Sequence, residues 1–141
     1  MLEVRHGVRV FVFRSTEEGA RFLLVRPRPR NEWPWVPVIG AVNLHEHLQD
    51  AVLREVREET GLARPLHLID LKHQEQTIVG DLGLVEWQFA FQVPAGIDPR
   101  LHLGPRIHEY HWAAFEHAFQ AVENITDRDG LVRLQCLLKA G

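Results

Sequence analysis

Residues 40–62 read GAVNLHEHLQDAVLREVREETGL, and this stretch decides the fold of the 141-residue chain. From residue 47 to residue 60 it contains neither Gly nor Pro, and apolar side chains recur at every fourth position: Leu48, Val52 and Val56. That period places them on one face of a helix, and Gly61 is a typical left-handed helix end. The stretch therefore predicts an amphipathic helix from His47 to Thr60.

Two carboxylates lie in the apolar stripe of this helix. At about 100° per residue, Glu55 and Glu59 project along nearly the same line as Leu48, and Glu58 lies to one side. An unpaired buried carboxylate costs several kcal/mol, and like charges at i and i+4 repel by about 0.2 to 0.5 kcal/mol. Glu55 and Glu59 therefore require a cation between them. Carboxylate ligands of this kind suit Mg²⁺ or Mn²⁺ and not Zn²⁺.

A solvated helix is the alternative explanation of the same residues. Arg54 and Glu58 stand at i and i+4, where opposite charges often form a surface ion pair, and the other carboxylates would then lie at the rim. The helix taken alone leaves both interpretations open.

The whole stretch matches the pattern G-x5-E-x7-R-E-U-x-E-E-x-G-U at every position, where U is an apolar residue. Chance would produce such a match in about 10⁻⁸ of chains of this length. The stretch resembles the signature box of the Nudix hydrolases, enzymes that cleave nucleoside diphosphates linked to another moiety. The resemblance implies a mixed β-sheet between helices and in-line attack of water on a phosphorus of a diphosphate or triphosphate.

The resemblance also implies roles for individual positions. Glu55, Glu58 and Glu59 resemble the metal-binding carboxylates, and the backbone carbonyl of Gly40 would complete the metal site. The resemblance further implies that Arg54 forms a bracing pair with Glu46. A further carboxylate would orient or deprotonate the attacking water, and the candidate is Glu109.

The chain departs from the family pattern at Ile39, His45 and Arg106. The family usually has Gly at the first two positions, and the change at His45 indicates a differently shaped loop at 41–46. Arg106 stands six residues before Trp112, where many members carry a Glu. The general base is therefore either Glu109 or a box carboxylate such as Glu55.

An irregular segment precedes the box, because prolines at 27, 29, 34 and 37 exclude regular helix up to about residue 39. Arg26 and Arg28 are candidates for binding substrate phosphates, and Trp35 is a candidate for stacking on a base. A solvated strand edge and a packed indole explain the same residues without a ligand. The spacing of Trp35 and Gly40 also resembles the sub-pattern of dihydroneopterin triphosphate and dATP pyrophosphohydrolases.

The rest of the chain predicts strands and further helices around the box. Strands are expected at 7–13, 21–25, 66–79, 83–93 and 109–113, and helices at 115–122 and 127–139. The second of these helices follows a capping pattern at Thr126 and Asp129. This order predicts an α/β (α+β) fold, a Nudix-type mixed sheet sandwiched between helices. Because no repeat or linker divides the chain, residues 1–141 are expected to form a single domain.

Composition limits the partners that the chain can bind. Sixteen Lys and Arg against 19 Asp and Glu give a net charge of −3, which argues against stable nucleic-acid binding.

The sequence shows no secretion signal and no long apolar run, so we expect a cytoplasmic protein with no membrane segment. The single cysteine, Cys136, excludes an internal disulfide and is expected to be buried. A homodimer is neither indicated nor excluded.

The expected function is metal-dependent hydrolysis of a diphosphate linkage in a nucleoside triphosphate or a related pterin triphosphate, with release of diphosphate. Dinucleoside polyphosphates or capped RNA are alternative substrates, but the net charge does not indicate the basic track that RNA would need. A nucleotide-sensing module without turnover is the alternative outside catalysis. The complete set of Glu55, Glu58 and Glu59 argues against it.

Overall fold

The computed structural model describes residues 2–27 and 34–140. Its elements, in chain order, are β1 (Glu3–Thr16), β2 (Gly19–Pro27), β3 (Val38–Ala41), α1 (Leu48–Thr60), β4 (His67–Val79), β5 (Leu82–Gln92), β6 (Ile107–Ala113), α2 (Phe115–Ala121) and α3 (Ile125–Ala140). Arg28, a candidate for binding phosphate, lies outside the described residues. The order of the elements confirms the predicted mixture of strands and helices.

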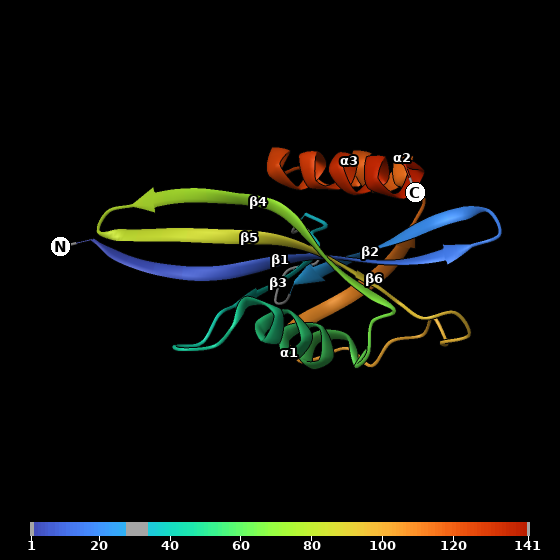
Figure 1. Ribbon diagram of the computed structural model, residues 1–141, viewed down its shortest axis with the longest axis horizontal. Helices are drawn as coiled ribbons and strands as arrows, with labels where there is room; N and C mark the ends of the chain where they lie inside the picture. The colour runs from blue at the N-terminus through green and yellow to red at the C-terminus, as the bar shows by residue number, and fades with distance from the viewer. Residues whose placement is uncertain (1, 28–33, 141) are drawn as a thin grey trace.

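The strands form one mixed, six-stranded sheet (Figure 1). Its order is β4-β5-β1-β2-β6, and β3 pairs with β1. Along one edge of β1, residues 7–10 pair with β3 and residues 13–16 pair with β2; β5 runs parallel to the other edge. Strand β3 is not predicted from the sequence, because it has only four residues and begins directly after Pro37, at the end of the proline-rich segment that is expected to be irregular.

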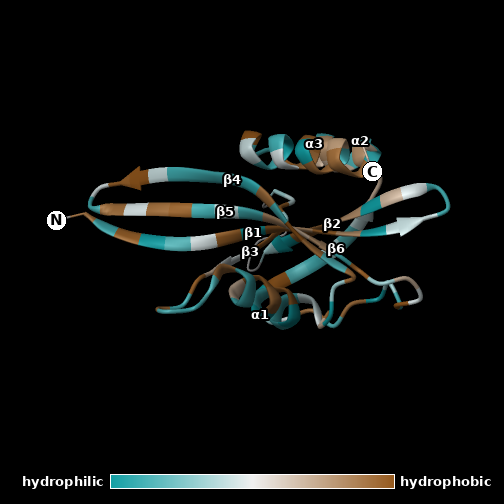
Figure 2. Ribbon diagram, viewed as in Figure 1, coloured by the Kyte–Doolittle hydropathy of each residue, from teal (hydrophilic) through white to brown (hydrophobic). Residues whose placement is uncertain are grey.

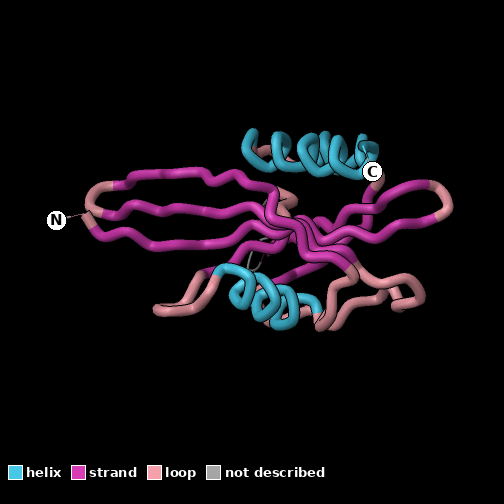
Figure 3. Tube along the Cα trace, in the orientation of Figure 1, coloured by secondary structure: helices cyan, strands magenta, loops and turns pink. Residues whose placement is uncertain are grey.

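Helices cover both faces of this sheet (Figures 1 and 3), with α1 on one face and α2 and α3 on the other. Val8 of β1 packs with Val56 of α1 in one buried cluster, whereas Phe11 of β1 packs with Leu131 of α3 in the other. Residues of opposite parity in β1 thus enter opposite layers, as the two-residue period of a strand requires. Hydrophobic and hydrophilic residues alternate along the helices in Figure 2, as expected of helices with one face on a sheet.

The boundaries of α1 confirm the prediction for the box, since the helix runs from Leu48 to Thr60. Gly61 has φ 82° and its N–H donates to the carbonyl of Arg57, which closes the helix in the expected left-handed conformation. α3 begins two residues earlier than predicted. Its cap is Asn124, whose Oδ1 accepts hydrogen bonds from the N–H groups of residues 126 and 127, at 2.8 and 3.2 Å.

The prediction of a buried Cys136 is wrong. The thiol is exposed on α3, because the face of this helix that packs on the sheet carries Leu131 and Leu134 and the cysteine points away from it. Within the part of the chain that the structure describes, no helix combines the length and apolar character needed to cross a membrane.

Candidate active site

The predicted pair of carboxylates lies on the buried face of α1. Glu55 and Glu59 are only 2% and 3% exposed, and they share this face with Val52 and Val56. The side chain of Glu58 is 48% exposed. The helical-wheel argument is therefore confirmed: two carboxylates are buried and the third lies to one side.

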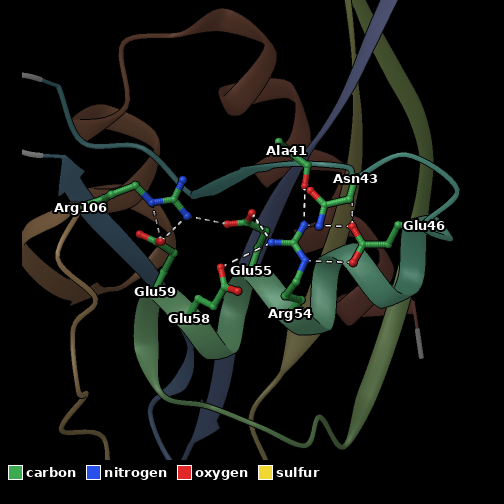
Figure 4. Close-up of polar contacts among 8 residues, drawn as sticks. All are labelled: Ala41, Asn43, Glu46, Arg54, Glu55, Glu58, Glu59 and Arg106. Carbon is green, nitrogen blue, oxygen red and sulfur yellow. Dashed lines mark hydrogen bonds and ion pairs between the residues drawn. The ribbon is translucent and has the colours of Figure 1, made fainter.

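Arg54 ties the loop before α1 to these carboxylates (Figure 4). Its Nε and Nη2 donate to the two carboxylate oxygens of Glu46, each at 2.9 Å, and Nη2 also donates to the carbonyl of Ala41 at 2.7 Å. Its Nη1 donates to Glu55 at 2.8 Å and to Glu58 at 3.4 Å. The expected pair of Arg54 and Glu46 is thus present, and so is the surface ion pair with Glu58.

The contact between Arg54 and Glu46 fixes the charge of both groups. Hydrogen bonds from Arg54, and then from the backbone N–H of Asn43, lower the pKa of Glu46 from 4.5 to about 2. The bond to Glu46 raises the pKa of Arg54, and Glu55 adds to this effect. Because folding depresses the pKa of Glu46, its contribution to stability is present above pH 4.5 and is lost as the pH falls towards 2. The loop at 41–46 therefore stays attached to α1 at neutral pH.

His45 adopts a φ of 65°, in the left-handed region that favours glycine. The family usually has Gly at this position. His45 thus adopts the left-handed backbone conformation although it has a side chain, at a cost of about 1 to 2 kcal/mol. The change from Gly to His does not remove the left-handed backbone.

Gly40 lies directly against the side chain of Glu55. A Cβ placed on Gly40 would stand 2.1 Å from Cδ and 2.4 Å from Oε2 of Glu55, far inside van der Waals contact. Only glycine leaves this space to the carboxyl group. Gly40 therefore forms a cradle for Glu55, a steric role in addition to the carbonyl ligand that the family resemblance implies.

We expect Gly40→Ala to displace the carboxyl group of Glu55. For the diphosphate hydrolysis that the resemblance implies, kcat/KM should fall about 10²-fold, since misplacement of a catalytic group by about 1 Å has an effect of this size. Stability should fall as well, because the clash includes Cγ of Glu55, whose buried carboxyl group would lose its hydrogen bonds to Arg54 and Arg106. Steady-state kinetics and thermal melting measure the two effects. Gly83→Ala is the matched control, because a Cβ on this strand glycine meets its nearest atom at 3.6 Å. Equal losses in both variants would contradict the cradle.

Arg106 supplies the cation that the two buried carboxylates require. Its Nε and Nη2 donate to Oε1 of Glu59 at 2.9 and 2.5 Å, and Nη2 also donates to Oε2 of Glu55 at 3.0 Å (Figure 4). Hydrogen bonding to Glu59 raises the pKa of Arg106 by more than burial lowers it. The sequence predicts a divalent metal ion between these carboxylates, which stays a prediction, and it gives no sign of Arg106, because no periodicity links α1 to a residue 47 positions beyond Glu59.

These side chains line one cavity of about 600 Å³. Its walls are formed by Ala41, Asn43, Arg54, Glu55, Glu58, Glu59, Pro105 and Arg106. Within residues 2–27 and 34–140, no three His, Cys, Asp or Glu side chains are gathered closely enough to hold a metal ion. The two buried carboxylates already share a cation, however, and oxygen donors of this kind fit Mg²⁺ or Mn²⁺ once the guanidinium moves away.

Three other predicted site residues lie together on the side of the sheet that carries α2 and α3. Arg26 and Glu109 face each other across β2 and β6 and form an ion pair. The guanidinium carbon of Arg26 lies 4.2 Å from the centre of the Trp35 ring, which packs against the buried cluster under α2 and α3. Among the described residues, Glu109 therefore contacts Arg26 rather than the carboxylates of α1. Substrate contacts of Arg26 and Trp35 stay predictions, as does a role of Glu109 as the base.

The family model of the NUDIX domain matches residues 5–134, nearly the whole chain. The chain belongs to the Nudix family. Proteins of this family generally use divalent metal ions and bind nucleotide-like substrates. The family assignment thus agrees with the carboxylates found on α1.

Solved structures share the Nudix fold. A Nudix hydrolase of Listeria monocytogenes is 21% identical, with a TM-score of 0.82 and coverage of 96% of this chain and 94% of that one. The dihydroneopterin triphosphate pyrophosphohydrolase of Escherichia coli is 19% identical, with a TM-score of 0.76 and coverage of 89% and 91%. An octanoyltransferase of Myxococcus xanthus is 37% identical over 98 residues, 67% of this chain but only 27% of that protein's length. The two structural likenesses establish the fold and leave the substrate open.

Proposed function

We propose that this Nudix hydrolase uses Mg²⁺ or Mn²⁺ to hydrolyse a diphosphate linkage in a nucleoside triphosphate or a related pterin triphosphate, with release of diphosphate. The main support is the buried pair of Glu55 and Glu59, which shares a cation in the wall of a cavity of about 600 Å³. A cavity of this volume is within the range of small-molecule sites.

In this proposal, Glu55, Glu58, Glu59 and the carbonyl of Gly40 would hold the metal. A bound divalent ion lowers the pKa of water and neutralises charge on the phosphate oxygens. Arg54 orients Glu55 through its 2.8 Å hydrogen bond. We favour Glu55 as the group that accepts the proton of the attacking water, because it lines the cavity, whereas Glu109 pairs with Arg26 on the other face of the sheet.

A neighbouring cavity of about 580 Å³ supports a substrate that also carries a flat ring. The two cavities share Ala41 and Asn43 in their walls. The neighbouring cavity is further lined by Trp87 and His6, which lie edge to edge: Nε1 of Trp87 donates to Nδ1 of His6 at 3.2 Å, and the two ring planes are within 21° of each other. A heteroaromatic ring can stack against this surface while its phosphates reach the carboxylates. Arg26 and Trp35 are the alternative contacts for that part of the substrate.

A substrate panel tests the proposal. The protein is incubated with Mg²⁺ or Mn²⁺ and, separately, with nucleoside triphosphates, dihydroneopterin triphosphate, diadenosine polyphosphates and capped RNA. We expect diphosphate release from at least one triphosphate, loss of that release with EDTA, and its recovery when Mn²⁺ is added in excess. If only the diadenosine polyphosphates or the capped RNA are cleaved, the proposed triphosphate substrate is wrong and the cleaved compound takes its place. Binding of panel members with no turnover would favour a nucleotide sensor.

A further inference from the structure

Arg106 holds the two buried carboxylates of α1 through three hydrogen bonds. Oε1 of Glu59 accepts two of them and Oε2 of Glu55 accepts the third (Figure 4). In Figure 4, Arg106 approaches from one side of the pair and Arg54 from the other. The guanidinium of Arg106 is therefore the cation that bridges Glu55 and Glu59.

Arg106 bonds to one oxygen of each carboxylate, Oε1 of Glu59 and Oε2 of Glu55, so a metal ion shared by the same pair would compete with its guanidinium. Divalent ions take carboxylate oxygens at about 2.0 to 2.6 Å, and a cationic guanidinium on those oxygens would repel the ion as well as block it. The two cations therefore exclude each other sterically and electrostatically. Arg54 also donates to Glu55, at 2.8 Å, but its Nε and Nη2 are held by Glu46 and by the carbonyl of Ala41. Arg106 has no such second anchor among its described contacts, so it is the cation that can leave the pair.

Arg106 can leave the pair without disturbing the core. Its side chain is 60% exposed, whereas those of Glu55 and Glu59 are 3% and 4% exposed. It stands between Pro105 and the first residue of β6, outside the regular strand. Rotation of this long side chain into solvent would expose the carboxylates to an ion while the backbone stays in place.

We propose that Arg106 is a built-in competitor of the catalytic metal: its guanidinium neutralises Glu55 and Glu59 when no metal is bound and is displaced when a divalent ion binds. This inference rests on the proposed function, because the ion is the one that hydrolysis requires. Arg106 stabilises the metal-free protein and weakens metal binding, so it sets the metal concentration at which the site fills.

Mn²⁺ binding in the absence of substrate tests the competition. Free Mn²⁺ is measured by electron paramagnetic resonance during titration of the wild type, Arg106→Ala and Arg106→Lys. We expect Arg106→Ala to bind Mn²⁺ about 10-fold more tightly than the wild type, and Arg106→Lys to lie between the two, because lysine keeps the charge but not the fork that makes three hydrogen bonds. Arg57→Ala is the matched control, because Arg57 is an exposed cation on α1, the helix that carries the two carboxylates. The affinity of this variant for Mn²⁺ should equal that of the wild type.

Thermal melting gives a second measurement that does not depend on turnover. Without metal, Arg106→Ala should melt at a lower temperature than the wild type, because two buried carboxylates lose their shared cation. Saturating Mn²⁺ should then raise its melting temperature by about 3 °C more than it raises that of the wild type. Arg106→Gln, which keeps a hydrogen-bonding group, replaces the alanine variant if the latter does not fold without metal.

The proposal is overturned if Arg106→Ala binds Mn²⁺ no more tightly than the wild type, or if Arg106→Lys binds as tightly as Arg106→Ala. Absence of Mn²⁺ binding in every variant would overturn both this proposal and the proposed function. Tighter binding by Arg106→Ala together with no turnover of any panel substrate would support the competition and reject the proposed hydrolysis. The two failures are therefore distinguishable.

Discussion

Glu59→Gln is expected to lower kcat/KM for the best panel substrate by at least about 10³-fold, which corresponds to about 4 kcal/mol of transition-state stabilisation. The carboxylate of Glu59 is buried and shares a cation with Glu55. The amide of Gln has nearly the same shape and can still accept a hydrogen bond from Arg106, but it is neutral and a weaker ligand for a divalent ion. Activity should therefore fall while the fold is retained.

Steady-state kinetics with saturating Mn²⁺ and circular dichroism measure these two properties. Glu58→Gln should cause a smaller loss than Glu59→Gln, because the side chain of Glu58 is 48% exposed and its described partner is Arg54. Glu116→Gln, on the exposed side of α2, is the control for loss of one negative charge and should leave kcat/KM unchanged. Retention of more than about a tenth of wild-type activity by Glu59→Gln would exclude Glu59 as a required metal ligand.

The sequence predicts α1 and its carboxylates well because every signal there is local. The four-residue spacing of Leu48, Val52 and Val56 fixes the buried face, and Glu55 and Glu59 follow on that face by the same geometry. Gly61 ends the helix through its own backbone conformation. Helix, cap and buried carboxylates can therefore be inferred from neighbouring residues alone.

The partners of these residues could not be inferred in the same way. Arg106 reaches Glu59 across 47 positions, and Arg26 meets Glu109 across 83, so both contacts depend on how the sheet is assembled. Glu109 is predicted as the base because it is a carboxylate outside the helix, in the strand expected at 109–113. The side of β6 that it occupies depends on the register of β2 with β6 and on the irregularity between Arg26 and Pro27. The sequence carries no local signal for that register.

Asp127→Ala is expected to lower the free energy of unfolding by about 3 to 5 kcal/mol, because it removes one partner of a buried ion pair. Asp127 is fully buried in the first turn of α3, and its two carboxylate oxygens accept from Nε and Nη2 of Arg9 at 2.7 and 2.6 Å. Arg9 is itself only 7% exposed. The alanine variant would leave this guanidinium with Glu86 alone, at 3.3 Å or more.

Urea unfolding followed by circular dichroism measures this loss, and two further variants show whether the ion pair causes it. Asp98→Ala removes an exposed partner of Arg100, at 2.8 Å, and should change the free energy of unfolding far less than Asp127→Ala, because solvent screens this pair. Arg9→Met and Glu86→Gln combined with Asp127→Leu remove all three charges of the cluster, so this triple variant should recover most of the stability that Asp127→Ala loses. If the triple variant is as unstable as Asp127→Ala, the loss comes from the packing of α3 on β1 and not from an unpaired guanidinium.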